Sequence, residues 1–354
     1  MASPQKKQNA FLYRAGVRLA GTVVACDAAA GGDLVFLSHA AVLGARGRRA
    51  LPHVGGSRRQ ILATEATLAL LGPFGERLRV QTLVVPYGRP FALGDLRLEI
   101  FPSGFMPGAA SLLCERDGRR LVYAGPLGQL DRVGQLGHVG QAGDGHAELR
   151  AADALCIDAR FATREIVFPE AVAAEESLRR IARDRSAGGA PLFLIEPPAL
   201  APVIARVLGA AGVPLRAHRT ILDAVAAFRQ VDPRSSYPQV QRFAGRLAEN
   251  EALLWPADAR PPSQGGQVRA RPSVLVSPRA GSAAAGARWG SAQRLTFPFG
   301  ADFAQLARYV EATGASEVAL VGAPDDELAE LLRGRGLSAY RIGPPRQIDL
   351  FQAA

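Results

Sequence analysis

The hydrophobic pattern of the chain changes at about residue 170, and this change limits the folds that the chain can adopt. Before it, short apolar runs alternate with turn residues, which is typical of β-sheet structure. After it, helical and strand patterns alternate up to about residue 232, which favours a parallel sheet covered by helices. The predicted strands of the first region are 19–27, 33–38, 81–86, 96–100, 110–115, 119–125 and 154–158, with one helix at 64–71. Those of the second are strands 192–195 and 215–217 and helices 170–185 and 200–209.

A third region restores regular structure after an irregular stretch. Residues 256–288 are rich in Pro, Gly, Ser, Ala and Arg around one strand candidate at 273–276. Helices are then predicted at 301–313 and 325–333, and strands at 317–321 and 338–341. The chain therefore contains β-rich, α/β and again α/β segments in that order.

Length and composition predict a globular protein of two or three domains. The chain has 354 residues, of which 48% are hydrophobic and 21% charged. No stretch approaches the roughly 18 uninterrupted apolar residues of a membrane span. The first residues lack the apolar core of a secretory signal, so we expect a cytoplasmic protein without membrane contact.

The cysteines and the net charge restrict the chemistry further. Cys26, Cys114 and Cys156 lie within apolar runs, and their spacing matches neither a disulfide framework nor a zinc motif, so we expect buried thiols. The net charge of +10 favours acidic partners, of which nucleic acid is the commonest, although a genome rich in Ala, Gly and Arg codons produces the same bias.

Several short segments, taken in order, resemble the β-CASP branch of the metallo-β-lactamase superfamily. The segments are ILATEAT at 61–67, VPYG at 85–88, LVYAG at 121–125, FP at 168–169, RYVEATGA at 308–315 and GPPRQIDLF at 343–351. Within this branch of nucleases, the chain is most similar to the bacterial ligase-associated exonucleases, or mRNA 3′-end processing factors. The resemblance implies an α/β protein, a metallo-β-lactamase αββα sandwich with an inserted β-CASP α/β domain. The core would comprise residues 1–170 and 291–354, and the insert residues 171–290.

The resemblance also implies that the metal site is degenerate. The S-H-x-H-x-D-H motif of active members falls on His39, Ala41, Leu43 and Gly44, and the later ligand or catalytic positions fall on Phe105, Pro126, Gly300 and Gly322. Only His39 remains, together with Asp27 as a neighbour of the ligands and Asp158 after the last core strand. A catalytic zinc normally needs three protein ligands and an open water position. We therefore expect no metal, no cofactor and no catalysis.

Two further interpretations concern the histidines and arginines. We expect the His39 ring to be held by a hydrogen bond from Asp27, while a zinc site relocated to His53, His138 and His146 is the alternative. Arginines that flank the degenerate loop are predicted to contact phosphate, the alternative being an ordinary solvated face. These arginines are Arg46, Arg48, Arg49, Arg58 and Arg59.

These observations predict a catalytically inactive homologue that acts as a scaffold or as a nucleic-acid-binding partner in RNA or DNA processing. Its partners would be RNA or DNA held through phosphates, and a catalytic homologue or a ligase or helicase of DNA repair. The alternative is an active metal-dependent nuclease with relocated zinc ligands. Recognition of something other than nucleic acid is a third possibility that the residues leave open.

Overall fold

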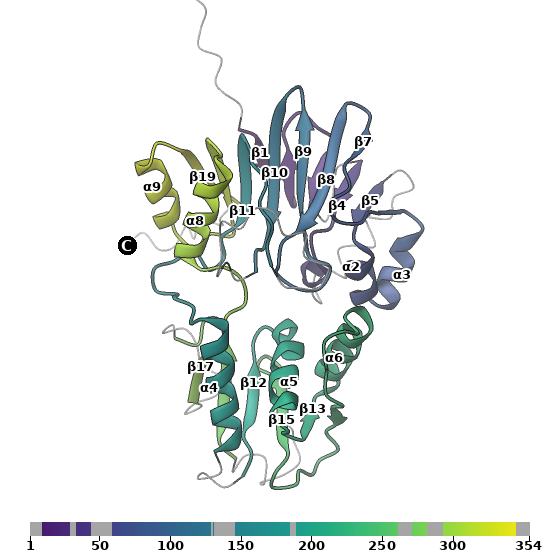
Figure 1. The fold of residues 1–354 in the computed structure, drawn as a ribbon, viewed down its shortest axis with the longest axis vertical. Coiled ribbons are helices and arrows are strands. Elements are labelled where there is room, and N and C mark those ends of the chain that lie inside the picture. Colours follow the sequence, from purple (N-terminus) through teal and green to yellow (C-terminus); the bar gives the residue numbers. More distant parts are fainter. Residues whose placement is uncertain are drawn as a thin grey trace, which may run out of the picture.

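The computed structural model describes residues 9–28, 33–43, 59–128, 130, 146–184, 189–260, 271–281 and 293–344. In these ranges the protein is a mixed α/β molecule whose strands form three sheets (Figure 1). Among the same residues, no helix combines the length and the apolar character needed to cross a bilayer.

The first sheet contains its strands in sequence order. They are β1 (Phe11–Tyr13), β2 (Val17–Leu19), β3 (Val24–Cys26), β4 (Leu34–Phe36), β5 (Gln60–Ala63) and β6 (Thr82–Val84). The first three pair antiparallel, and the pairs from β3 to β6 are parallel. The single strand predicted at 19–27 is wrong, because a turn closed by the Thr22 hydroxyl on Leu19 O separates β2 from β3.

The second sheet joins segments that lie far apart in the sequence. Its order is β19-β18-β11-β10-β9-β8-β7, so the last two strands of the chain extend a sheet begun by the first region. The four strands from β7 to β10 pair antiparallel, and β10, β11, β18 and β19 pair parallel. The strands are β7 (Phe91–Leu93), β8 (Leu96–Pro102), β9 (Ala110–Arg116), β10 (Arg119–Gly125), β11 (Ala154–Asp158), β18 (Glu317–Val321) and β19 (Ser338–Ile342).

The two sheets and the helices on their outer faces form four layers, because successive side chains of a strand point to opposite faces of its sheet. Phe36 and Cys156 point into a core between the sheets, which also buries the free thiols of Cys26 and Cys114 as expected. Val35 faces the opposite way, toward α2 (Glu65–Leu70) and α3 (Pro73–Arg79). Leu155 packs under α8 (Phe303–Thr313) and α9 (Glu327–Gly334). The order is therefore helices, first sheet, second sheet, helices.

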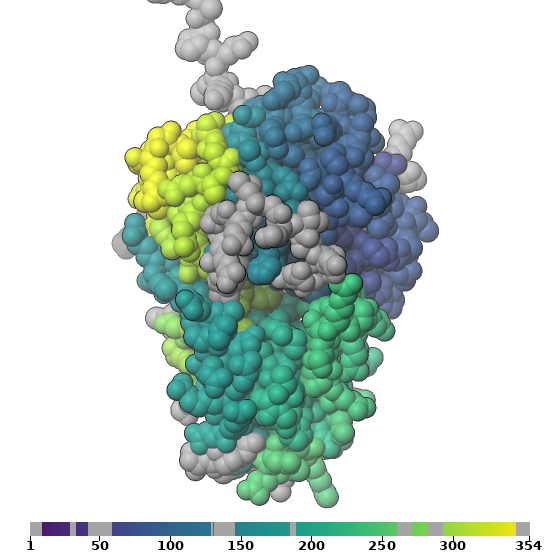
Figure 2. Space-filling view, viewed as in Figure 1, coloured from purple at the N-terminus to yellow at the C-terminus, as the bar shows by residue number. Residues whose placement is uncertain are grey.

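The third sheet is entirely parallel, with the order β14-β13-β15-β12-β16-β17. Its strands are β12 (Leu192–Ile195), β13 (Leu215–Ala217), β14 (Gln241–Arg242), β15 (Ala252–Pro256), β16 (Ser273–Ser277) and β17 (Gln293–Thr296). Helices α4 (Ala171–Arg183), α5 (Ala201–Ala210) and α6 (Arg219–Val231) bury their apolar faces against it. The parallel α/β layer predicted for this region is thus confirmed. It forms the lower part of the molecule in Figure 2.

The chain enters and leaves the third-sheet part at one place, which we call the junction (residues 159–170 and 297–302). Asp302 caps α8 by accepting from Gln305 N, and its second oxygen accepts a hydrogen bond of 3.1 Å from Phe168 N. Because the Asp302 side chain is buried, this contact fixes the outgoing chain against the returning chain.

Candidate functional site

The positions singled out by the sequence gather where the strands of the two core sheets end. Asp27 follows β3, His39 follows β4, Pro126 follows β10, and Gly322 follows β18, while Asp158 is the last residue of β11. Strands β3 and β4 are parallel, as are β10, β11 and β18, so within each sheet the carboxyl ends lie at the same edge. This edge faces the third-sheet part of the molecule (Figure 1).

Asp27 is the centre of a partly buried hydrogen-bond network. Its carboxylate accepts from Ser38 N at 2.8 Å, from the Ser38 hydroxyl at 2.5 Å and from the Tyr123 hydroxyl at 2.8 Å. Burial raises the pKa of Tyr123, and the Asp27 charge acts in the same direction, so the phenol keeps its proton and donates it. Three donors thus stabilise the charge on Asp27.

His39 is joined to this network through Ser38. The Ser38 hydroxyl has a single proton, which it gives to Asp27, so the His39 Nδ1 atom, 2.7 Å away, must donate to Ser38 Oγ. The neutral ring therefore has an unprotonated Nε2. The expected direct bond from Asp27 is wrong, because Ser38 lies between the two side chains. Burial lowers the pKa of His39 and the Arg160 guanidinium adds to this effect, whereas Asp27 and Asp158 oppose it.

Aromatic rings occupy the space beside the imidazole. Phe105, which stands where the resemblance places a histidine ligand, meets His39 edge-on with ring centroids 5.2 Å apart and an interplanar angle of 90°. Phe299, from the returning side of the junction, packs on Phe105 at 4.7 Å. Phe105 therefore lies between His39 and Phe299, and the two phenyl rings form an apolar stack beside the imidazole.

A guanidinium occupies the other side of the site. Arg160 Nε lies 3.0 Å from both carboxylate oxygens of Asp158, and Nη2 lies 2.5 Å from one of them. The arginine stem passes Gly322, where an added Cβ would lie 3.9 Å from Arg160 Cβ. The positive charge of Arg160 also acts on Asp27 and Tyr123. Asp158 is therefore neutralised by a neighbour in the sequence.

The donor atoms that are present do not fit a zinc ion. Both oxygens of Asp158 contact Arg160, Asp27 accepts three hydrogen bonds, and the Phe105 ring beside His39 has no atom that can bind a metal. In the ranges that the structure covers, no three His, Cys, Asp or Glu side chains lie close enough together to hold a metal. Zinc would need at least three such ligands.

Backbone geometry adds to this mismatch at two positions. Gly300 has a φ of +112° and Gly322 a φ of +70°, and L side chains rarely adopt either conformation. A histidine at Gly300 would in addition bring its Cβ within 3.4 Å of Leu127 O. Restoring a ligand at these positions would therefore require the local backbone to change.

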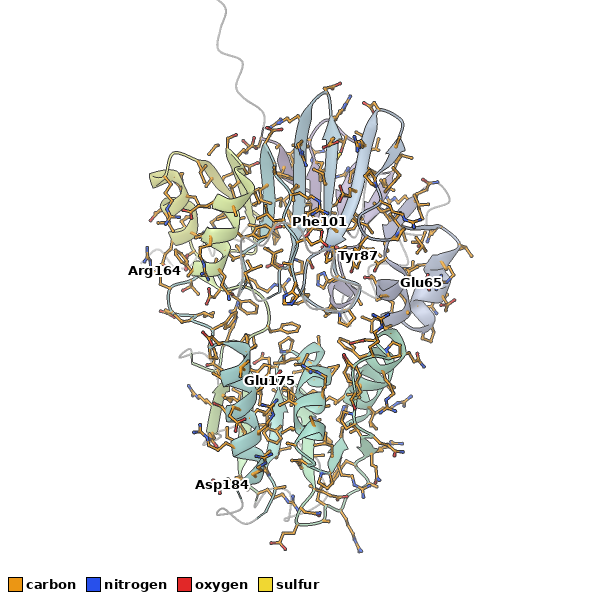
Figure 3. All side chains as sticks on the ribbon, viewed as in Figure 1. Glu65, Tyr87, Phe101, Arg164, Glu175 and Asp184 are labelled. Atoms are coloured by element: carbon orange, nitrogen blue, oxygen red, sulfur yellow. The ribbon has the colours of Figure 1, made fainter. Side chains whose placement is uncertain are left out.

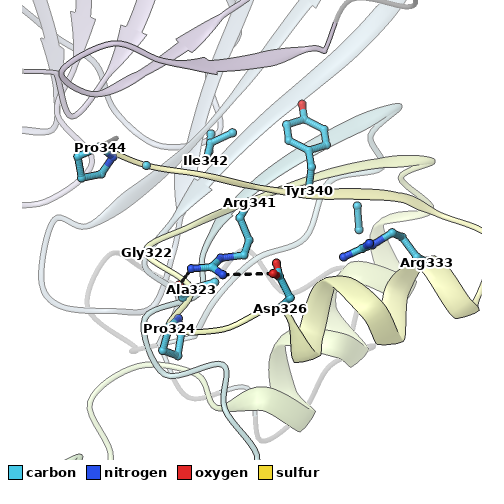
Figure 4. A pocket seen from close by; sticks show the side chains of 11 residues that line it. Gly322, Ala323, Pro324, Asp326, Arg333, Tyr340, Arg341, Ile342 and Pro344 are labelled. Atoms are coloured by element: carbon cyan, nitrogen blue, oxygen red, sulfur yellow. Dashed lines mark hydrogen bonds and ion pairs between the residues drawn. The ribbon is translucent and has the colours of Figure 1, made fainter. Parts of the chain in front are cut away.

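A cavity of about 830 Å³ begins beside Gly322 (Figure 4). The loop after β18 and strand β19 form its walls. Arg341 crosses it, donating to Ala323 O at 2.9 Å and pairing with Asp326 at 3.4 Å. This arginine holds the loop that carries Gly322.

The remaining predicted residues have varied positions. Ala41 and the backbone of Leu43 belong to a 3-10 helix, η1 (Ala40–Leu43), and Arg59 is half-buried just before β5. His146 neighbours Ala147, which forms a β-bridge with Ser103. Residues that lie outside the described ranges are Gly44, Arg46, Arg48, Arg49, His53, Arg58 and His138.

Sequence reasoning missed three residues of this site: Ser38, Tyr123 and Arg160. Ser38 was detectable as the hydroxyl next to His39, but nothing in the pattern around Tyr123 or Arg160 indicates that either side chain turns toward Asp27 or Asp158. Comparison with known proteins adds no further candidates, because no protein-family model matches the chain and no curated protein sequence matches it either.

Proposed function

We propose that the chain is a non-catalytic protein of the metallo-β-lactamase/β-CASP type. Its αββα core would comprise residues 1–170 and 291–354, with residues 171–290 as the inserted domain. The four packed layers support this proposal, as does the return of the chain to the second sheet after the third sheet is complete. The meeting of Phe168 and Asp302 gives the insertion adjacent ends.

We further propose that the protein acts as a scaffold or nucleic-acid-binding partner in cytoplasmic RNA or DNA processing. The observation that carries this proposal is the Asp158–Arg160 pair, a fixed cation at the strand ends where the family would hold metal. Such a site lacks the Lewis acid and the activated water that metal-dependent phosphodiester hydrolysis requires, whereas a guanidinium offers hydrogen-bond donors that phosphate oxygens can accept. The protein partner would be a catalytic homologue, or a ligase or helicase.

Metal analysis and a binding titration test this proposal. Labelled single- and double-stranded RNA and DNA are titrated at several salt concentrations, with and without zinc. We expect weakly sequence-dependent binding without cleavage. Replacing Arg46, Arg48 and Arg49 together by alanine should flatten the slope of log affinity against log salt by about two to three for duplex DNA.

A matched triple variant controls for the change in net charge. Arg97 on β8, Arg219 on α6 and Arg335 after α9 are exposed, and their joint replacement by alanine removes the same charge. This control should leave the slope nearly unchanged. No binding even at low salt would reject the nucleic-acid role, and stoichiometric zinc with metal-dependent cleavage would establish the active nuclease instead.

A further inference from the structure

Strand β19 is an open edge of the second sheet. Among the described strands it has one neighbour, β18, because the order of the sheet ends with it. Ser338 N donates to Ser316 O at 2.9 Å, so Ser338 and, two residues later, Tyr340 bond to β18. The backbone N–H and C=O groups of Ala339 and Arg341 point the other way, where no described residue pairs with them. They can therefore pair with a further strand.

The devices that usually prevent pairing at a sheet edge are missing from β19. Edge strands are commonly interrupted by a bulge or a proline, or they carry an exposed charge. Strand β19 pairs with β18 without a register shift, and Pro344 lies beyond its end. Its one charged side chain, Arg341, donates to Ala323 O, pairs with Asp326 and is only 21% exposed. The backbone of β19 thus remains accessible.

The cavity of about 830 Å³ lies between this strand and α9 (Figure 4). Residues 339–344 form one wall, and Arg333 of α9 contributes to the opposite one. Its volume is within the range of about 300–1,000 Å³ that is typical of ligand pockets. In strand addition, the backbone of an extended segment pairs with the edge strand, and alternate side chains enter pockets beside it. A groove between an edge strand and a helix suits this mode of binding.

Arg333 gives the groove an unpaired positive charge. Its Nε donates to Ala329 O at 3.2 Å, and neither Nη atom has a partner among the described residues. The side chain is exposed and extends from α9 into the space beside β19 (Figure 4). A guanidinium with two unused nitrogen atoms favours a carboxylate as its partner.

The neighbouring carboxylates do not cancel this charge. Asp326 pairs with Arg341 at 3.4 Å, and Glu327 pairs with Arg164 (labelled in Figure 3) at 3.8 Å. Glu330, on the same helix, does not line the cavity. The charged residues that line the cavity are thus two arginines and one aspartate, with a net charge of +1.

From this geometry we propose that the edge of β19 binds an extended acidic segment of a second protein by strand addition, and that a carboxylate of the segment pairs with Arg333. The inference rests on the scaffold role in the proposed function and names the surface that holds the protein partner. Backbone bonds to Ala339 and Arg341 provide affinity, whereas the charge of Arg333 selects acidic segments over basic ones.

The test titrates the full chain with three short labelled peptides. In the first, Thr alternates with Glu; in the second, Lys replaces Glu; the third is the Glu peptide N-methylated at alternate residues. The protein is used as the wild type and as Arg333→Glu. Arg308→Glu on α8 is the matched control, because Arg308 is also exposed, forms no ion pair among the described residues and does not line the cavity.

We expect the wild type to bind the Glu peptide more tightly than the Lys peptide. Arg333→Glu should weaken binding of the Glu peptide about fivefold and strengthen binding of the Lys peptide, since it replaces an ion pair by a like-charge contact and the reverse. Arg308→Glu should change neither. N-methylation should weaken binding, because it removes backbone donors and retains the charges.

Amide hydrogen exchange measured by NMR locates the peptide. The N–H groups of Ala339 and Arg341 should exchange faster than that of Tyr340 in the free protein, and the Glu peptide should slow them. Equal binding of the methylated and unmethylated peptides would overturn strand addition. Equal effects of Arg333→Glu and Arg308→Glu would overturn the contact with Arg333.

Further outcomes separate this inference from the proposed function. If the wild type binds RNA or DNA but none of the peptides, the surface is wrong and the nucleic-acid role stands. Zinc-dependent cleavage would reject the proposed function, while the peptide titration would still decide the surface. A dimer that the Glu peptide dissociates in analytical ultracentrifugation would overturn the second protein as occupant, because the edge would then pair with another copy of this chain.

Discussion

At the scale of single residues, the Asp27 hydrogen-bond network orders the strand ends of the two core sheets. Ser38 connects β4 to the residue after β3, and Tyr123 connects the second sheet to the same carboxylate. Hydrogen bonds to a charged acceptor stabilise a fold more than neutral ones do, typically by about 1.5–3 kcal/mol. These hydrogen bonds to Asp27 therefore stabilise the arrangement of the strand ends.

The Tyr123 hydroxyl provides the first prediction. Tyr123→Phe should lower the free energy of unfolding by about 1–3 kcal/mol, because it removes a donor to a half-buried carboxylate and keeps the ring. Urea denaturation measures the change. Tyr13→Phe, on the partly exposed strand β1, should change it by no more than about 0.5 kcal/mol. Equal effects of the two substitutions would show that the Asp27 contact contributes nothing.

The lowered pKa of His39 predicts how stability depends on pH. Because the folded pKa is below the unfolded value of about 6.5, the unfolded chain takes up a proton first as the pH falls. The contribution of neutral His39 is fully present above about pH 6.5 and decreases below it. As the pH is lowered from 8 to 5, the free energy of unfolding should therefore decrease more steeply for the wild type than for His39→Gln. Parallel curves would mean that His39 titrates normally.

At the scale of elements, Glu317 on β18 holds the start of the chain against its end. Its buried carboxylate accepts from Ala10 N at 2.5 Å, from the Tyr340 hydroxyl on β19 at 2.8 Å and from Arg119 on β10 at 2.9 Å. Three segments that are distant in sequence thus depend on one side chain.

Glu317→Gln should consequently destabilise the protein by about 1.5–3 kcal/mol, since the amide weakens every one of these bonds and presents a donor to other donors. Thermal and urea unfolding check this value. Glu311→Gln is the control, because the Glu311 side chain forms an exposed pair with Arg335, for which about 0.5 kcal/mol or less is expected. A larger effect at Glu311 would contradict the argument.

Which elements the sequence could predict follows from their burial. The strands at 119–125, 154–158, 192–195 and 317–321 have the predicted bounds, because each contains a short run of buried apolar residues. Helix α3 was missed, because Pro73 and Gly75 are residues that usually indicate a turn or loop. That the carboxyl ends of the core strands lie at one edge was predictable from the order of the strands in the sequence. The Asp158–Arg160 pair was not, because a side-chain rotamer two residues from a strand leaves no periodic signal.

At the scale of the whole molecule, the junction makes the third-sheet part separable. Replacing residues 171–299 by a short Gly/Ser linker should leave a folded, cooperatively melting core, because Phe168 and Asp302 already touch. Circular dichroism and gel filtration test this variant. A chain truncated after residue 170 is the contrasting control and should not fold, since Leu155 and Ile157 lose the cover of α8. Identical behaviour of the two chains would contradict the proposed division into domains.

The pairing of β11 with β18 also sets an order of events during synthesis. Ala154 pairs with Glu317, so a ribosome that adds about 5–20 residues per second leaves β11 without this neighbour for roughly ten to thirty seconds. The third-sheet part leaves the ribosome complete within that interval. The third-sheet part can therefore fold first. During this time the edge of β11 is unpaired and needs protection from pairing with other nascent chains.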